Sequence, residues 1–304
     1  MHELISDYLK KHDVEHYENM SLSAISTVRI GGVAWTVAYP NTVDKLKKTV
    51  EMCNDLKIRY KIFGRMSNVL FGDSCYDGVV IRTDRLVGVT FDGACLTARA
   101  GDTLPILFSK AASMSLSGLE ELSGIPSSLG GAICGNAGAY GRSISDLISS
   151  VTVFDTDTMH TFTFPPDKLG FAYRTSSLKN SCGLIITEAT LALTPAYSSE
   201  ILKSAHEYKQ KRLLTQPVGR PSLGSVFKRC GDFSAGELID RVGLKGARIG
   251  GAEISTKHAG FIINSGGATA EDYLALMNLA RDTVRNKLSK ILEPEIETVN
   301  IKEV

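Results

Sequence analysis

The sequence predicts an α+β fold, and three observations favour this class. Strand-like and helix-like segments are interleaved along the 304 residues without a strict β-α-β alternation, which argues against a doubly wound parallel sheet. Hydrophobic residues make up 43% of the chain and charged residues 22%, as in globular domains. Several of the 28 glycines are concentrated between Gly118 and Gly141, where the chain carries almost no charge. This concentration predicts specialised loops within a packed fold.

The first half of the chain supplies helices and strands in turn. Residues 4–9 predict a short amphipathic helix, a turn-rich segment follows, and residues 27–40 are typical of a strand. Asn41 is expected to cap the next helix, in which apolar residues recur at helical spacing from 43 to 53. Further strands are expected at 60–63, 78–83, 87–91 and 95–100, and a further helix at 104–114.

The second half resumes after the glycine-rich segment. Its predicted elements are strands at 151–155, 160–164 and 184–193, a charged helix at 198–213, a loop rich in Pro, Gly and Ser at 216–225, a long helix capped at Thr269, and a final strand at 295–301.

Charge and cysteine usage exclude several classes of protein. The formal net charge is +1, so no global field marks a nucleic-acid or membrane-surface binder. The first twenty residues interleave charged and apolar positions, and no apolar run approaches the length of a membrane span, so we expect a cytoplasmic protein. The six cysteines form no CxxC pair and have no histidine at zinc-ligand spacing, which predicts reduced thiols and no metal site.

The common nucleotide and hydrolase motifs are missing. The chain contains no GxxxxGK[ST] loop, no GxGxxG after a strand, no GxSxG and no HExxH. Two unusual loops remain, at 63–70 (FGRMSNVL) and at 124–141 (GIPSSLGGAICGNAGAYG). Successive small residues leave backbone N–H groups unobstructed, and a concave run of such groups binds phosphate oxygens. One such loop alone would be typical of a tight turn with a purely structural role, but the two together favour a ligand with two phosphates, and the structural alternative stays open.

At these residues the chain resembles the bacterial UDP-N-acetylenolpyruvoylglucosamine reductase (MurB) family of peptidoglycan synthesis. The resemblance covers nearly the whole chain, since ordered motifs follow one another from the first loop to the C-terminal part. They are TVRIGG at 27–32, GRMSN at 64–68, GLEELSGIPSSLGGAICGNAGAYG at 118–141, YRTS at 173–176, PSLGSVFK at 221–228, GLKGARIGGAEISTKHAGFIIN at 243–264 and LEPE at 292–295. The short distance from YRTS to the C-terminal part resembles the family's second type, which lacks an extra loop over the substrate.

The resemblance implies an FAD-binding fold of the PCMH (vanillyl-alcohol-oxidase-like) type, with two α+β subdomains and a C-terminal α+β substrate domain. The implied boundaries are 1–80 (completed by 295–304), 81–197 and 198–294. FAD is bound non-covalently in this family, and NADPH is the hydride donor. The implied cofactor-binding residues are Gly64, Arg65, Met66, Ser67, Asn68, Val69, Leu70, Gly124, Ile125, Pro126, Gly130, Gly131, Ala132, Asn136, Ala137, Gly138, Ala139 and Gly141.

Two positions depart from the family pattern. Met66 replaces the second glycine of the usual GxGSN loop, and Ser127 replaces the last glycine of GIPG. Met66 therefore requires either a negative φ or a tolerated strain, with its side chain directed away from the phosphates.

The implied reaction reduces UDP-N-acetylglucosamine enolpyruvate to UDP-N-acetylmuramate. By resemblance, Arg174 and Glu295 lie at the substrate carboxylate, where negative charge develops, and Ser225 protonates the resulting enediolate-like species. An always-charged guanidinium suits that carboxylate, and a neutral Glu295 would donate a hydrogen bond to it. Without the resemblance, Ser225 would be an ordinary loop hydroxyl, Arg174 a partner in a surface ion pair and Glu295 an exposed carboxylate.

The remaining expectations concern the substrate and the rival functions. Tyr173, Lys228, Arg229 and His258 are expected on the substrate side, and Lys228 and Arg229 add positive charge suited to a diphosphate. We expect a monomer and leave a homo-oligomer open. Two alternatives also stay open: another flavin oxidoreductase of the same fold, and a non-catalytic flavin-binding protein.

Overall fold

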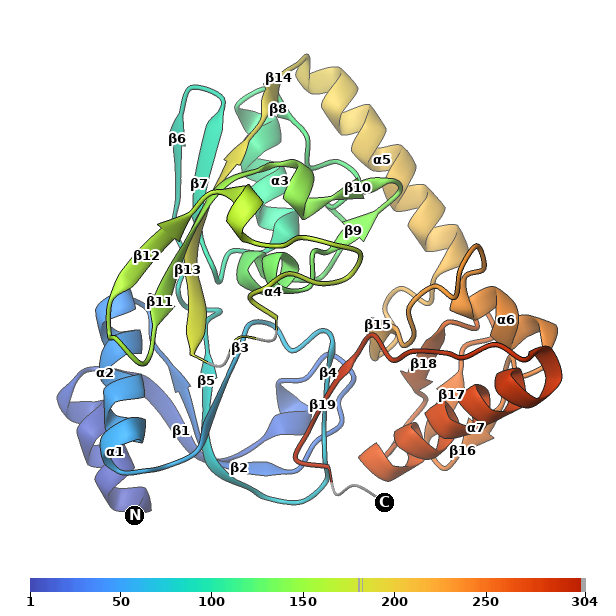
Figure 1. Cartoon of the computed structure of the whole chain (residues 1–304), viewed down its shortest axis with the longest axis horizontal. Coiled ribbons are helices and arrows are strands. Elements are labelled where there is room, and N and C mark those ends of the chain that lie inside the picture. Colours follow the sequence, from blue (N-terminus) through green and yellow to red (C-terminus); the bar gives the residue numbers. More distant parts are fainter. Residues whose placement is uncertain (180, 182, 302–304) are drawn as a thin grey trace. The chain divides into compact units, whose positions relative to one another are not determined.

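The computed structural model describes residues 1–179, 181 and 183–301, and these divide into two compact units (Figure 1). Unit 1 comprises Met1–Glu18, Thr36–Arg65 and Gly78–Lys211. Unit 2 comprises Asn19–Trp35, Met66–Asp77 and the residues from Arg212 onward. Helices and strands are mixed in both units, which confirms the predicted α+β class. The boundaries 1–80, 81–197 and 198–294 stay a prediction.

The first layer of unit 1 is a four-stranded sheet with strand order β1-β2-β5-β3. Two helices bury their apolar stripes against it, because Ile5 and Leu9 of the first helix and Leu46 and Val50 of the second share one core with Val79 of the sheet. The elements are α1 (His2–Lys11), β1 (Glu15–Ser21), β2 (Val33–Tyr39), α2 (Val43–Asp55), β3 (Tyr60–Phe63) and β5 (Tyr76–Arg82).

Three sequence-based expectations for this layer were wrong in detail. The segment expected to be turn-rich contains β1, and the strand expected from residue 27 begins only at Val33. The cap of α2 is Thr42 and not Asn41, because the Thr42 hydroxyl accepts a hydrogen bond from the Lys45 N–H at 3.2 Å. Two adjacent residues were competent to cap, and the chain reaches the extended cap geometry at the second of them.

The second layer of unit 1 is an antiparallel sheet of five strands in the order β12-β11-β13-β7-β6. Its inner face packs on α3 and α4, since Leu96 and Val151 of the sheet share a core with Leu104, Leu107 and Leu129 of the helices. The elements are β6 (Val89–Asp92), β7 (Cys95–Arg99), α3 (Leu104–Ser113), α4 (Leu129–Cys134), β11 (Ile148–Asp155), β12 (Thr161–Phe164) and β13 (Leu184–Ala192).

Two small strand pairs and a long helix complete unit 1. Two small antiparallel pairs join β9 (Gly138–Ala139) to β10 (Arg142–Ser143) and β8 (Leu116–Ser117) to β14 (Thr194–Pro195). The long helix α5 (Ser198–Thr215) buries only Ile201 and Ala205. Among the described residues, single-turn 3-10 helices lie at Ile144–Asp146 and Pro166–Lys168 in unit 1 and at Leu22–Ala24 in unit 2.

Unit 2 is built on a four-stranded antiparallel sheet with strand order β15-β18-β17-β16, which shares one core with α6 and α7. Its α7 begins at the predicted cap, since Thr269 and Asp272 form a capping box. A separate parallel pair joins β4 to β19. The elements are β4 (Val69–Phe71), β15 (Ser222–Ser225), α6 (Ala235–Arg241), β16 (Arg248–Ile249), β17 (Ala252–Ile254), β18 (Phe261–Asn264), α7 (Ala270–Leu288) and β19 (Glu297–Val299).

The described residues hold no membrane-spanning helix, no metal-binding cluster and no disulfide. None of the helices they form is long and apolar enough to cross a membrane. They contain no group of three or more His, Cys, Asp or Glu side chains able to hold a metal ion. Five of the cysteines are free thiols, and Cys182 lies outside the described part of the chain.

Candidate active site

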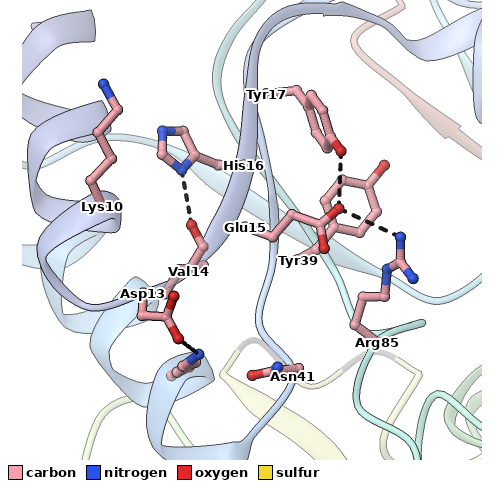
Figure 2. A pocket seen from close by; sticks show the side chains of 10 residues that line it. Lys10, Asp13, Val14, Glu15, His16, Tyr17, Tyr39, Asn41 and Arg85 are labelled. Carbon is pink, nitrogen blue, oxygen red and sulfur yellow. Dashed lines mark hydrogen bonds and ion pairs between the residues drawn. The ribbon is translucent and has the colours of Figure 1, made fainter.

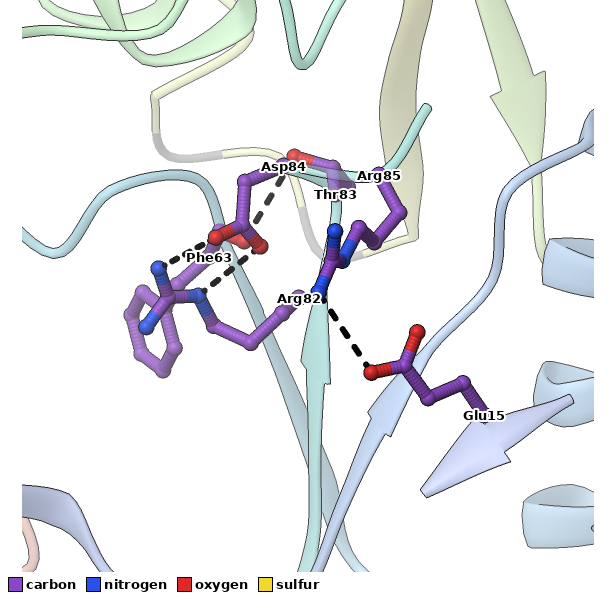
Figure 3. A network of polar contacts seen from close by, with 6 residues as sticks. All are labelled: Glu15, Phe63, Arg82, Thr83, Asp84 and Arg85. Carbon is purple, nitrogen blue, oxygen red and sulfur yellow. Dashed lines mark hydrogen bonds and ion pairs between the residues drawn. The ribbon is translucent and has the colours of Figure 1, made fainter. Parts of the chain in front are cut away.

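The first glycine loop starts at the end of β3, where it is held by the neighbouring strand. Phe63 pairs in parallel with Arg82 of β5, and the Phe63 carbonyl accepts a hydrogen bond from the Thr83 N–H at 2.9 Å. The buried Arg82 guanidinium makes two hydrogen bonds to the Asp84 carboxylate, of 3.2 and 2.8 Å (Figure 3). This bidentate pair stabilises the chain that follows β5 and, through Thr83, the point at which the loop begins.

Met66 stands where the family has the second glycine of its first loop, and its conformation shows how the loop accommodates a side chain there. Its φ is +54°, in the left-handed region, and its side chain is only 2% exposed. The strained alternative that the sequence left open is therefore the one observed, with the side chain buried rather than presented to solvent. Burying a methionine contributes about 1.5–3 kcal/mol, which offsets a left-handed cost of about 1–2 kcal/mol.

The second glycine loop leads into α4, whose N-cap is Ser128. The Ser128 hydroxyl accepts a hydrogen bond from the Gly131 N–H at 3.3 Å, and Gly130 packs closely enough on Ala100 that an added Cβ would lie 3.1 Å from the alanine Cβ. The two glycine loops meet here. A Cβ on Gly64 of the first loop would lie 2.0 Å from the Ser128 Oγ, so only glycine fits at this contact.

Ser127, the other departure from the family pattern, is accommodated without strain. It is not among the residues with positive φ, so no glycine is required there. Its carbonyl accepts a hydrogen bond from the Leu104 N–H at 3.1 Å, which ties this loop to the start of α3.

Arg174 lies in a tight turn whose two ends, Ala172 and Thr175, exchange backbone hydrogen bonds of 3.1 and 3.2 Å. Its φ of +58° is left-handed, and such strain at a non-glycine residue is characteristic of functional sites. The guanidinium Nη2 donates to the Gly138 carbonyl at 3.0 Å, and the Asn136 amide donates to the Ala172 carbonyl at 3.0 Å. The structure thus brings Arg174 against the second glycine loop.

In unit 2, hydrogen bonds join three segments that are far apart in the sequence. The Asn68 side chain donates to the Glu295 carbonyl at 3.0 Å, and the Glu295 N–H donates to the carbonyl of Val226, the residue after Ser225, at 2.8 Å. The Glu297 N–H donates to the Asn68 carbonyl at 2.9 Å, at the start of the β4–β19 pairing. The first glycine loop, Glu295 and the Ser225 strand are therefore neighbours, with the Ser225 and Glu295 side chains only half-buried.

The expected substrate-side residues of unit 2 lie on or next to these segments. The Lys228 N–H donates to the Glu293 carbonyl at 2.9 Å, and Arg229 follows it on the surface. The His258 Nδ1 accepts from the Gly260 N–H at 3.1 Å, so in the neutral ring Nε2 carries the proton. Burial lowers the pKa of His258; a backbone hydrogen bond partly opposes this shift, and the nearby Lys245 charge adds to it. His258 is therefore a neutral hydrogen-bond donor at neutral pH.

A pocket of about 760 Å³ lies elsewhere in unit 1, between α1, β1 and α2 (Figure 2). Four of its charged side chains form two ion pairs, Lys45 with Asp13 at 2.6 Å and Arg85 with Glu15 at 3.5 Å. None of the predicted site residues lines it. We therefore build the active site on the loops and not on this pocket.

Comparison with known proteins agrees with this geometry. Residues 35–161 match the model of an FAD binding domain, and residues 216–299 match that of the UDP-N-acetylenolpyruvoylglucosamine reductase C-terminal domain. The chain is 38% identical over 294 residues to the UDP-N-acetylenolpyruvoylglucosamine reductase of Caldicellulosiruptor bescii, covering 96% of this chain and 93% of that protein.

The chain belongs to the UDP-N-acetylenolpyruvoylglucosamine reductase family. The reductase of Lactobacillus acidophilus is likewise 38% identical, over 96% of this chain and 97% of that protein. The crystal structure of the family member from Thermus caldophilus matches with a TM-score of 0.78 and 35% identity, covering 94% of this chain and 98% of that one. These matches confirm the FAD-binding fold of the PCMH type that the resemblance implied, and FAD as the cofactor of the family.

The glycine loops fit such a cofactor. The backbone of the second loop is exposed at Gly124, Gly131 and Gly141, which carry no side chains of their own. At Gly141, whose φ is +89°, an added Cβ would meet nothing within 4 Å, so the space before the loop is open. An exposed backbone without side chains suits phosphate oxygens.

Two residues that support the loops were missed by the sequence analysis. Ser128 carries the contact with Gly64, and its position just before Leu129 and two glycines was a capping signal. Tyr208 on α5 stacks on Tyr140 of the second loop, and no local pattern pointed to it.

Proposed function

We propose that this chain catalyses the NADPH-dependent reduction of UDP-N-acetylglucosamine enolpyruvate to UDP-N-acetylmuramate, with non-covalently bound FAD. Membership of the reductase family over nearly the whole chain supports the reaction. The observation that carries the residue assignment is the hydrogen-bonded set of Asn68, Glu295 and Val226. It joins a cofactor loop, a proposed acid and the strand of a proposed proton donor, and all three lie in separate family motifs.

The cofactor is held by the two glycine loops in this proposal. Backbone groups of 64–70 and 124–141 would bind the diphosphate, and the Gly64–Ser128 contact keeps the loops together. When bound, FAD supplies the hydride that is added to carbon 3 of the enolpyruvyl group, after receiving it from NADPH.

Arg174 is assigned to the substrate carboxylate. Hydride addition at carbon 3 moves negative charge onto that carboxylate, which takes on enediolate character. A guanidinium held in place by the Gly138 carbonyl stabilises this charge more strongly than the ground state, which is the condition for catalysis. In its neutral form Glu295 would donate a hydrogen bond to the same group, and its backbone is held on both sides, by Asn68 and by Val226.

Ser225 is assigned the proton transfer to carbon 2. A serine hydroxyl is a weak acid and donates its proton only to a strongly basic partner within hydrogen-bond reach. The enediolate-like species is such a partner, and Ser225 regains its proton from water. The strand position of Ser225 suits this role, because β15 is fixed to β18 by pairing with Phe261.

The substrate's other groups are assigned to exposed or half-buried residues near these motifs. Lys228 and Arg229 would bind the diphosphate, Tyr173 would contact the substrate beside Arg174, and the His258 Nε2–H would donate a hydrogen bond. The product is a precursor of peptidoglycan, so the activity serves cell-wall synthesis and through it cell shape and division. We place it in the cytoplasm and expect a monomer there.

Anaerobic stopped-flow measurements on Ser225→Ala test the assignment. We expect this variant to bind FAD and to be reduced by NADPH, but to lose reoxidation by the enolpyruvyl substrate. Ser222→Ala, on the same strand, is the matched control and should keep both half-reactions. Near wild-type reoxidation in Ser225→Ala would remove the proton-donor role, and failure of the wild-type protein to be reoxidised by this substrate would refute the proposed function itself.

A further inference from the structure

The Arg174 guanidinium is fixed to a small hairpin of the second glycine loop. It donates to the Gly138 carbonyl at 3.0 Å, and Gly138 pairs with Ser143 in the β9–β10 pair. The position of the guanidinium therefore follows the position of this hairpin, which has only two residues on each strand.

The turn of the hairpin is strained. Tyr140 and Gly141 form the two-residue connection, and both have positive φ, of +53° and +89°. Glycine or asparagine is favoured at the first of these positions, because glycine has no Cβ to approach the carbonyl oxygen and the asparagine side chain can hydrogen-bond locally. A tyrosine persists there only if the surrounding structure holds it.

Helix α5 provides that support through Tyr208. The rings of Tyr140 and Tyr208 stack with a centroid distance of 4.8 Å and an interplanar angle of 29°. Glu121 contacts both the hairpin and helix α5. Its carboxylate lies 3.9 Å from the Arg142 guanidinium of the hairpin and accepts a hydrogen bond from the Tyr208 hydroxyl of α5 at 3.4 Å. The Lys211 ammonium lies 5.2 Å from the centre of the Tyr208 ring and adds a cation–π contact.

We propose that Tyr208 is a positioning residue for Arg174. Tyr208 holds Tyr140 in its strained turn, the turn sets the position of Gly138, and the Gly138 carbonyl orients the guanidinium. The inference rests on the proposed role of Arg174 at the substrate carboxylate. A displacement of about 1 Å at a catalytic group is enough to slow a reaction by up to roughly 100-fold, so an indirect contact of this kind is measurable.

A double-mutant cycle tests the proposal. The rate constant for reoxidation of the NADPH-reduced holoenzyme by the enolpyruvyl substrate is measured for wild type, Tyr208→Leu, Arg174→Lys and the double variant. We expect Tyr208→Leu to lower it roughly tenfold in the wild-type background but less than about twofold in the Arg174→Lys background, because residues that act through one another are not additive. Tyr208→Phe keeps the stacked ring and should retain at least about a third of the wild-type rate.

Controls separate this role from a general effect on folding. Tyr197→Leu makes the same exchange just before α5, at a side chain that is 77% exposed, and should change nothing. Bound FAD and the thermal midpoint are measured for each variant, so that rates are compared at equal flavin content. An equal slowing by Tyr208→Leu in both backgrounds, or no slowing in either, would overturn the positioning role. Wild-type reoxidation in Arg174→Lys would instead refute the proposed role of Arg174, and the inference with it.

Discussion

Replacing Gly64 by alanine is expected to separate the two glycine loops. The added Cβ would lie 2.0 Å from the Ser128 Oγ, which is closer than two non-bonded atoms can come, and 3.0 Å from the Ser128 Cβ, which is a tight contact. Ser128 cannot simply turn away, because it is 1% exposed and its hydroxyl caps α4. The substitution must therefore either break the cap or move one loop away from the other.

The size of the effect follows from two free-energy costs, that of overpacking the contact and that of losing the helix cap. Overpacking a well-packed contact costs about 1–3 kcal/mol, and losing a serine cap costs about 1 kcal/mol. If the whole of this strain of about 2–4 kcal/mol fell on the FAD-binding conformation, the dissociation constant of FAD would rise roughly 30- to 700-fold. This is an upper bound, since strain that is also present in the apo-protein lowers its stability instead.

Fluorescence titration of the apo-protein with FAD measures the loss of affinity, and thermal unfolding measures the loss of stability. Ser128→Gly removes the clashing atoms at a cost of only a few tenths of a kcal/mol for the cap, so the Gly64→Ala/Ser128→Gly double variant should recover most of the lost affinity. Gly135→Ala is the matched control, because its Cβ would lie 3.7 Å from the nearest neighbouring atom, the Gly131 carbonyl oxygen. Wild-type affinity and stability in Gly64→Ala would refute the reasoning, and so would a double variant that binds FAD as weakly as Gly64→Ala alone.

Three further substitutions test polar side chains by urea denaturation. Tyr273 is fully buried, and its hydroxyl has no hydrogen-bond partner among the described residues, so Tyr273→Phe should leave the free energy of unfolding unchanged or raise it by up to about 1 kcal/mol; a clear loss would contradict this. Asp84→Ala takes the carboxylate from the buried Arg82 and should cost about 3 kcal/mol, whereas a loss under about 1 kcal/mol would show that the pair is not structural. Hydrogen bonds from backbone N–H groups, that of Thr269 foremost, lower the pKa of Asp272. Its carboxylate therefore stabilises the fold above its ordinary pKa of about 3.9 and loses this effect as the pH falls through the lower folded-state pKa, so the stability difference between wild type and Asp272→Asn should shrink from about pH 6 to about pH 3.

Elements in which the local sequence pattern agrees with the packing could be predicted from the sequence. The strand at Tyr60–Phe63 has both of its expected ends, and the cap at Thr269 is confirmed by a capping box. In these segments the local signal agrees with the packing, because the buried residues of α7 repeat at helical spacing.

Elements that depend on distant partners could not be predicted in the same way. Ser222–Ser225 lies in a segment rich in Pro, Gly and Ser, yet it is a strand because it pairs with β18. Helix α4 contains two glycines with low helix propensity, but its Ser128 cap and the burial of Leu129 and Ile133 outweigh them. Tertiary contacts decide both cases, and a local pattern carries no information about them.

The candidate site depends even more on contacts between residues that are far apart in the sequence. Asn68 and Glu295 are 227 positions apart, and nothing in either local sequence indicates their hydrogen bond. Without the family resemblance, Ser225 is an ordinary loop hydroxyl and Arg174 a partner in a surface ion pair, so their roles follow only from the resemblance. The left-handed φ of Arg174 and the stacking of Tyr208 on Tyr140 become visible only in three dimensions.

Anaerobic mixing of the purified holoenzyme, first with NADPH and then with UDP-N-acetylglucosamine enolpyruvate, tests the central claim most directly. We expect the yellow flavin absorbance to bleach with NADPH and to return in proportion to the enolpyruvyl substrate added, with UDP-N-acetylmuramate as the product. A protein that takes up no FAD when it is supplied in excess, or a bleached flavin that this substrate fails to reoxidise, would contradict the account.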